Sequence, residues 1–232
     1  MSRLLTATRL EALVLRRHGF VYAAVVVVAT WSVVLRLLPD KALDDAVPIA
    51  VWFDLAIVGF FFMAASVLLE KGQHTTSALV VTPLRFREYL GAKVIALGLL
   101  GLASSTVVVL STHGTDVNFA LLLPGVALNA VIVLLYSFFT VTPFTNISTW
   151  YMPSVFFLSC LDLAIIPHVG WSDHILLRAL PSYGPLQLIA GAFGPIDGSS
   201  VVYAIGMSLG WAVVLAWLCK WFHQRFTLER MA

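Results

Sequence analysis

The chain has 232 residues, of which 60% are hydrophobic and 11% charged, and its formal net charge is +2. A soluble globular protein carries about a quarter charged residues, so this composition excludes the ordinary soluble classes and indicates an integral membrane protein. A net charge so close to zero gives no indication of a nucleic-acid partner, and we expect the lipid bilayer itself to be the main environment.

The first 19 residues mix four arginines with leucines, and we expect them to lie at the cytoplasmic membrane surface. The alternative is a basic tail that only satisfies the rule that positive charge stays inside. The first predicted span, Phe20–Leu38, is long enough at 1.5 Å per residue to cross roughly 30 Å of hydrocarbon.

Five more apolar stretches follow, and polar segments separate them. Placing both termini in the cytoplasm leaves only Arg36, Lys41 and Arg178, of fourteen Lys and Arg residues, on the outer side. The sequence therefore predicts an all-α integral membrane protein, one transmembrane domain over residues 1–232, with six transmembrane helices and both termini cytoplasmic. The later spans are expected at about Pro48–Leu69, Tyr89–Leu110, Phe119–Phe139, Pro153–Pro167 and Ser200–Phe222.

Two features belong to the last third of the chain. Within the outer loop 168–199, residues 180–193 are too apolar for an exposed loop and too few to span, which predicts a re-entrant segment between the fifth and sixth spans. Gly206 and Gly210 form a GxxxG pattern, from which we expect close packing against another helix.

The cytoplasmic loop 70–88 is the only long polar interruption in the first half of the chain. Hydroxyl side chains at residues 75–77 are suited to capping a helix, residues 78–81 supply one apolar turn, and Pro83 ends it. Such a turn cannot bury its apolar face by itself. We expect it to dock onto a soluble partner.

Motifs for catalysis and nucleotide binding are absent from the sequence. It contains no GxxxxGK[ST] phosphate loop, no GxGxxG, no HExxH, no GxSxG and no Cys/His cluster at metal-binding spacing. We therefore predict no catalytic, cofactor-binding or metal-binding residue in this chain.

Two aspartates, Asp54 and Asp162, lie inside predicted spans, where a carboxylate costs about 2.5 to 3.5 kcal/mol at the bilayer centre. One interpretation is structural, with Asp54 paired to Arg36 and Asp162 capping a helix or reaching water. The other makes them polar contacts for a cationic or zwitterionic solute in an outward-facing pathway. A catalytic pair of the intramembrane aspartyl protease kind is disfavoured because neither residue sits in a GxGD pattern.

The stretch 70–93 resembles the permease subunit of bacterial type-2 ABC transporters. The family pattern is matched by VTPL at 81–84 and by REYLGAK at 87–93, whereas His74, Thr76 and Ser77 depart from it. Phe157-Leu158-Ser159 and the segment 180–193 also resemble family stretches, although Cys160 and Ala190 replace the usual glycine and arginine. The Ala/Val/Leu-rich style is similar to actinobacterial multidrug permeases, including those proposed to export fluoroquinolones.

This resemblance implies a subunit in the bacterial inner membrane that pairs with a second permease, identical or homologous. A coupling helix between spans 2 and 3 would sit on a separate ATPase, so that two ATPase subunits, and not this chain, bind ATP and Mg. The cargo would be a small hydrophobic or amphipathic drug, antibiotic or lipid; the alternative is a stand-alone secondary transporter or channel. The implied ATPase-coupling residues are Thr75, Thr76, Ser77, Ala78, Leu79, Val80, Val81, Thr82, Pro83, Arg85 and Arg87.

Overall fold

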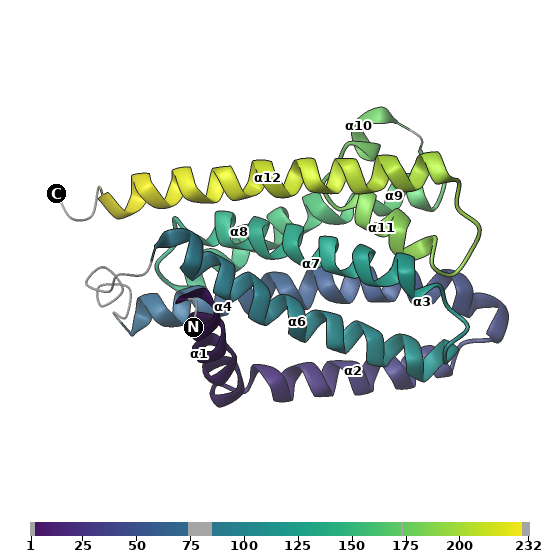
Figure 1. Ribbon diagram of the computed structural model, residues 1–232, viewed down its shortest axis with the longest axis horizontal. Helices are drawn as coiled ribbons and strands as arrows, with labels where there is room; N and C mark the ends of the chain where they lie inside the picture. The colour runs from purple at the N-terminus through teal and green to yellow at the C-terminus, as the bar shows by residue number, and fades with distance from the viewer. Residues whose placement is uncertain (1–2, 74–84, 173, 229–232) are drawn as a thin grey trace.

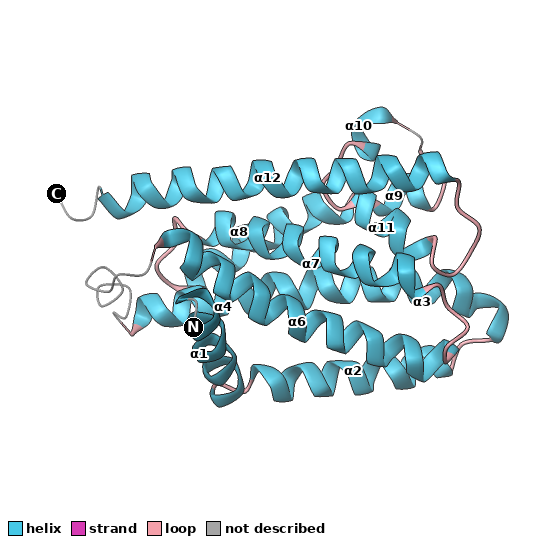
Figure 2. Cartoon of the chain, in the orientation of Figure 1, coloured by secondary structure: helices cyan, strands magenta, loops and turns pink. Residues whose placement is uncertain are grey.

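The computed structural model describes residues 3–73, 85–172 and 174–228, and all regular structure in these ranges is helical (Figure 2). The first half contains α1 (Arg3–Arg17), α2 (Phe20–Arg36), α3 (Asp40–Asp54), the π-helix η1 (Leu55–Gly59), α4 (Phe60–Gly72) and α6 (Phe86–His113). The second half contains α7 (Phe119–Val141), α8 (Ile147–Asp162), α9 (Ile165–His168), α10 (Ile175–Arg178), α11 (Tyr183–Ala190) and α12 (Gly198–Leu228).

Five segments of the described chain are long and apolar enough to cross a membrane, and the bent pair α1–α2 supplies a sixth if it is counted as one span. The predicted all-α membrane fold is confirmed with five to six candidate spans, and the predicted first span, Phe20–Leu38, qualifies only when α2 is joined to α1. α2 has 17 residues and meets α1 at an angle of 67°. The five continuous segments are Ala42–Gly72, Phe86–His113, Phe119–Val141, Ile147–His168 and Gly198–Phe222.

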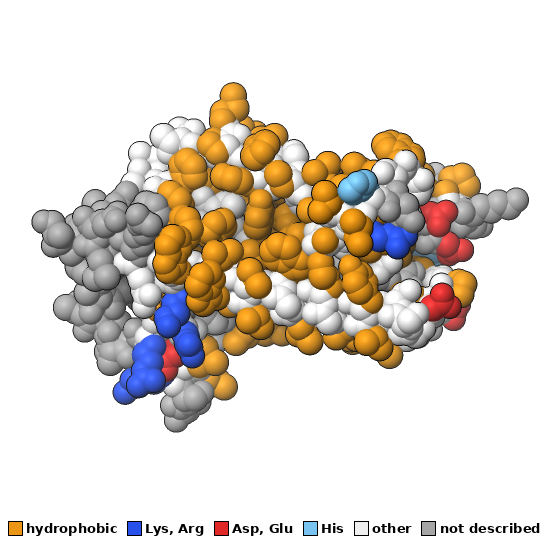
Figure 3. Space-filling view, turned by 90° about the horizontal axis from the view of Figure 1, so that it is seen from above, with side chains coloured by type: hydrophobic (Ala, Val, Ile, Leu, Met, Phe, Trp, Pro, Cys, Tyr) orange, Lys and Arg blue, Asp and Glu red, His pale blue; other side chains and the backbone are white. Residues whose placement is uncertain are grey.

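The two ends of the bundle differ in charge. α1 and the C-terminal part of α12 lie at one end, together with the end of α4 and the start of α6 (Figure 1). Basic side chains gather at this end, whereas the acidic side chains visible on the same face lie mainly at the other (Figure 3). The membrane side on which each end lies stays a prediction from the charge rule.

The segment expected at the membrane surface is the helix α1, and a glycine separates it from α2. Gly19 has φ of 86°, in the left-handed region that residues with a Cβ rarely adopt. The chain therefore turns sharply there, and α1 packs along α6 with Leu15 buried.

The second span contains a π-helical break between α3 and α4, and two polar residues of α7 bracket it. The Asn129 amide donates to the carbonyl of Trp52 (3.2 Å), and the Ser137 hydroxyl donates to that of Phe60 (2.5 Å). The two donors are eight residues apart in α7, and the two acceptors are eight residues apart in the second span. Side chains thus bind carbonyls on each side of a segment in which the regular hydrogen-bond ladder is interrupted.

The apolar segment 180–193 contains the short helix α11, which is buried against α3, α7 and α12. Close helix packing occurs here, because a Cβ at Gly184 would lie 2.6 Å from the Ser208 hydroxyl and 2.7 Å from the Ala204 carbonyl oxygen of α12. The packing expected at Gly206 and Gly210 is not formed within the described chain: a Cβ at either would meet open space. Within the described chain, α12 packs through Ala204 and Ser208 instead, and packing of Gly206 and Gly210 against a helix of another chain stays a prediction.

Candidate functional site

A buried ionic cluster joins three helices at the basic end of the bundle. Lys93 of α6 is fully buried, and its ammonium donates to Glu11 of α1 (2.7 Å) and Glu70 of α4 (2.7 Å). It also donates to the Ser66 hydroxyl of α4 (2.6 Å), so all three of its N–H donors have partners. The Tyr89 hydroxyl donates to the second oxygen of Glu70 (2.6 Å).

A second lysine holds the end of α4 against α7. The Lys71 ammonium donates to the carbonyl oxygens of Val141 (3.3 Å), Thr142 (2.7 Å) and Phe144 (2.8 Å). These carbonyls lie at the C-terminal end of α7, where the helix leaves its last acceptors unpaired and where a cation is electrostatically favoured. Lys71 and Lys93 therefore fix the two helices that flank residues 74–84.

Of the predicted coupling residues, Arg85 and Arg87 belong to the described chain. Arg85 precedes α6, and its backbone N–H donates to the Glu88 carboxylate (2.8 Å), which starts the helix. Both arginine side chains are exposed at the basic end. The predicted coupling helix, residues 75–83, lies outside the described residues.

Asp54 is buried at the junction of α3 and η1, and its partner is not the predicted one. The Trp31 indole N–H of α2 donates to its carboxylate (2.9 Å). Arg36, which was expected to pair with it, donates instead to the carbonyl of Ser111 (2.9 and 2.8 Å). Asp54 borders a small, mostly apolar cavity of about 30 Å³ between α2, η1, α6 and α7.

Asp162 occupies a different environment at the last residue of α8. One of its carboxylate oxygens is buried and has no hydrogen-bond partner among the described residues. The preceding residue, Leu161, accepts a hydrogen bond from the Ser182 hydroxyl (2.6 Å), which ties α8 to the start of α11. The structure thus places the two predicted aspartates on separate helices with different neighbours.

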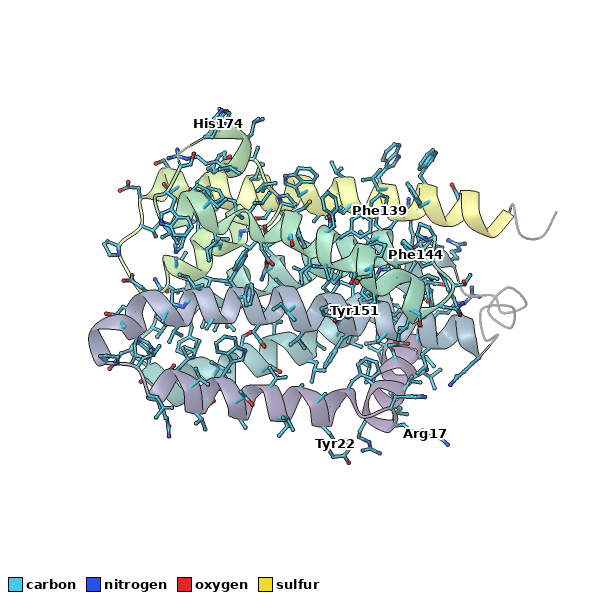
Figure 4. The ribbon with its side chains drawn as sticks, turned by 180° about the vertical axis from the view of Figure 1, so that it is seen from behind. Arg17, Tyr22, Phe139, Phe144, Tyr151 and His174 are labelled. Carbon is cyan, nitrogen blue, oxygen red and sulfur yellow. The ribbon has the colours of Figure 1, made fainter. Side chains whose placement is uncertain are left out.

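An open groove of about 380 Å³ lies where the bend between α1 and α2 faces α4 and the start of α8. In Figure 4, Tyr151 on α8 and Arg17 beside the bend lie toward the same end of the bundle. The Tyr22 side chain points outward, away from the bundle. The groove is mostly apolar and aromatic. Its lining residues are His18, Gly19, Phe20, Ala23, Phe61, Phe62, Ala65, Ile147, Trp150 and Tyr151.

Aromatic packing fixes one wall of this groove. The Trp150 ring stacks on Phe60 at 5.4 Å and meets Phe61 edge-on at 5.6 Å. The Trp150 indole N–H is buried without a hydrogen-bond partner among the described residues.

Sequence reasoning missed Lys93 as a structural centre and missed the groove altogether. A signal for Lys93 was available, since it lies four residues inside the predicted third span, where a charge requires a partner. No comparable signal pointed to the groove, because its walls come from the bend at residues 18–19 and from three helices, α2, α4 and α8, that are far apart in the sequence.

The helical bundle, its apolar spans and its charge asymmetry define a multi-pass membrane protein. Residues 2–231 match the fluoroquinolones export permease protein family, and the chain belongs to this family. It is similar to the fluoroquinolones export permease proteins of two Mycobacterium tuberculosis strains, CDC 1551 and H37Rv, with 34% identity in each case. Each match covers 90% of this chain and 92% of the relative. The resemblance to export permeases that the sequence suggested is thus confirmed.

Proposed function

We propose that this chain is the membrane-spanning subunit of an ATP-driven exporter in the bacterial inner membrane, working with a second permease and two separate ATPase subunits. The observation that carries the proposal is the bracing of α4 and α6 by Lys71 and Lys93. Two helices held this firmly on each side of a short polar segment can receive a push at that segment and pass it into the bundle. The sequence has no phosphate loop, so the ATP would be hydrolysed by another chain.

The solute we propose is a flat, amphipathic aromatic drug, and the groove beside Trp150 is the place for it. Family membership supports the drug class, and the aromatic wall supports the shape. A groove of about 380 Å³ is within the usual size range of small-molecule pockets, and its position near the basic end would admit solute from the cytoplasm.

The test uses the tagged chain purified from its native membranes together with the subunits that accompany it. Reconstituted vesicles should take up a fluorescent fluoroquinolone only when ATP is supplied on the side of the basic end. Leu79→Asp in the predicted coupling helix should abolish this uptake, whereas Thr6→Asp on the exposed face of α1 should preserve it.

Uptake driven by a proton gradient in the absence of ATP would reject the proposal and favour a secondary transporter. Unchanged uptake in Leu79→Asp would reject residues 75–83 as the coupling element. Either result would leave the family assignment intact.

The two aspartates remain proposed solute contacts. The cavity beside Asp54, at about 30 Å³, has less than a tenth of the volume of the groove, about 380 Å³, so a direct contact with a drug there requires the surrounding helices to separate. In the same vesicles, Asp54→Asn and Asp162→Asn should reduce export of a cationic drug more than export of a neutral one. If both variants export both drugs as well as the unmodified chain does, the aspartates are not solute contacts.

A further inference from the structure

The attachment of α1 to the bundle depends on one side chain of unusual placement. Glu11 is the only acidic residue of α1, and the four arginines of this helix are exposed. Its carboxylate turns inward instead, and one oxygen accepts hydrogen bonds from both Lys93 (2.7 Å) and Ser66 (3.1 Å). A helix with an exposed, basic outer face thus carries one inward charge bound to the bundle, in addition to the apolar packing of Leu15.

Glu11 and Glu70 meet on the same ammonium, which joins three helices at one atom. Glu70 is two residues before the end of α4, and Lys93 is in the second turn of α6. A displacement of these two helix ends therefore moves the atom to which α1 is bound. All three N–H donors of Lys93 are already used. The ammonium therefore has no free donor with which to bind a water if one of the two carboxylates moves away.

The other end of α1 leads directly to the groove. Gly19 turns the chain from α1 into α2, and both His18 and Phe20 beside it line the groove wall. The Phe20 ring, at the start of α2, packs edge-on against Phe62 at 5.0 Å, so a swing of α1 about Gly19 moves His18 relative to Phe20 in the groove wall.

We propose that Lys93 is a positioning residue that makes α1 move as one body with the ends of α4 and α6. Through Gly19, this movement reaches the groove wall. The link between α1 and the helix ends is a property of this chain alone; its role in transport rests on the function proposed above. α1 then acts as a lever: it transmits a displacement of the ends of α4 and α6 to the groove in which we place the solute.

A purely stabilising role for the cluster is the alternative. Buried ion pairs contribute little net stability on average, because desolvation offsets their attraction, and they are better suited to fixing one arrangement of helices. The stabilising role and the positioning role predict different effects for a conservative variant. Glu11→Gln keeps the Lys93–Glu70 pair and the length of the side chain, but removes the charge that holds α1.

The first measurement follows the position of α1 in the purified chain without any ATPase. Leu15 faces the bundle and is 2% exposed, so a cysteine placed there should react slowly with a water-soluble maleimide. Adding Glu11→Gln should raise the reaction rate at Leu15→Cys at least tenfold. Arg9→Gln, an exposed charge change on the same helix, should leave it within twofold.

Two controls make this result specific. Thr6→Cys, on the exposed face of α1, should react at the same rate in every background. The chain with only its native cysteines, Cys160 and Cys219, supplies the background to be subtracted. A rate at Leu15→Cys that stays within twofold in Glu11→Gln, with unchanged Thr6→Cys, would overturn the proposal.

The second measurement uses the vesicles described above and counts drug molecules transported per ATP hydrolysed. Glu11→Gln should lower this ratio at least fivefold while ATP hydrolysis continues, and Glu11→Asp should restore part of it. A merely structural role would reduce the amount of folded protein but not the ratio, so an unchanged ratio would overturn the lever. If the unmodified chain shows no ATP-dependent transport, the proposed function fails, and the labelling experiment still decides the link.

Discussion

The two ends of the bundle are held together by different kinds of polar contact. At the basic end, two lysines bind carboxylates of α1 and α4 and carbonyls at the end of α7. At the opposite end Arg36 donates to the Ser111 carbonyl and His113 contacts Asp44 (3.1 Å), but most contacts are neutral and go to backbone carbonyls, as with Trp52 to Ser182 (3.2 Å) and Trp211 to Ala179 (2.9 Å).

This difference bears on the proposal that the basic end receives the push from an ATPase. A hydrogen bond to a charged group is stronger than a neutral one, and losing one charge of a buried pair is costly. Neutral contacts to carbonyls tolerate small shifts at modest cost. Under that proposal the basic end would move as a unit, whereas the opposite end would adjust locally.

Lys93→Met should have the largest effect, because it leaves two carboxylates at the basic end without their cation. We expect the free energy of unfolding to fall by about 3 to 5 kcal/mol. Thermal unfolding of the purified chain in detergent measures this, with the exposed Lys220→Met as control. Equal melting temperatures for the two variants would contradict the contrast between the ends.

Lys71→Met should come second. It removes charged donors from three carbonyls at the end of α7, and we expect a loss of about 1.5 to 3 kcal/mol. The same unfolding assay applies. A loss no larger than that of Lys220→Met would show that these carbonyls find other donors.

Ser182→Ala tests the neutral end and should cost only about 1 kcal/mol, because it removes one uncharged hydrogen bond to Leu161. Ser159→Ala, whose hydroxyl bonds within its own helix at an exposed position, is the matched control. A loss as large as that of Lys93→Met would remove the difference between the two ends.

Tyr151→Ala should change drug handling more than stability, since Tyr151 is 57% exposed and lines the groove. Loss of one aromatic contact is worth about 0.5 to 1.5 kcal/mol, so the drug concentration at half-maximal export should rise roughly two- to tenfold. Tyr22→Ala, which is 70% exposed and points away from the bundle, should have no effect (Figure 4). Equal effects of the two variants would place the solute elsewhere.

Much of the fold was readable from the sequence because hydrocarbon imposes length and polarity on each span. The expected second span, 48–69, lies within Ala42–Gly72, and the expected fourth, 119–139, lies within Phe119–Val141. The orientation of the chain and its coupling helix were expected from charge and resemblance, and they stay predictions.

Side-chain partners were much less predictable. Asp54 was expected to pair with Arg36 because a buried carboxylate was expected to require a cation. The Trp31 indole N–H donates a hydrogen bond to this carboxylate instead, without a second charge. The packing face of α12 was missed for a related reason. Small residues occur on two faces of that helix, and only the tertiary arrangement selects Ala204 and Ser208 over Gly206 and Gly210.

The π-helix Leu55–Gly59 sets the helical phase of everything that follows it in the second span. A π-helical turn absorbs one residue more than an α-helical turn, and one residue of an α-helix corresponds to a rotation of about 100°. If this segment rewound as regular α-helix, α4 would rotate by that amount relative to α3. Ser66 and Glu70 would then face away from Lys93, so the ionic cluster at one end of the span depends on a one-residue surplus near its middle.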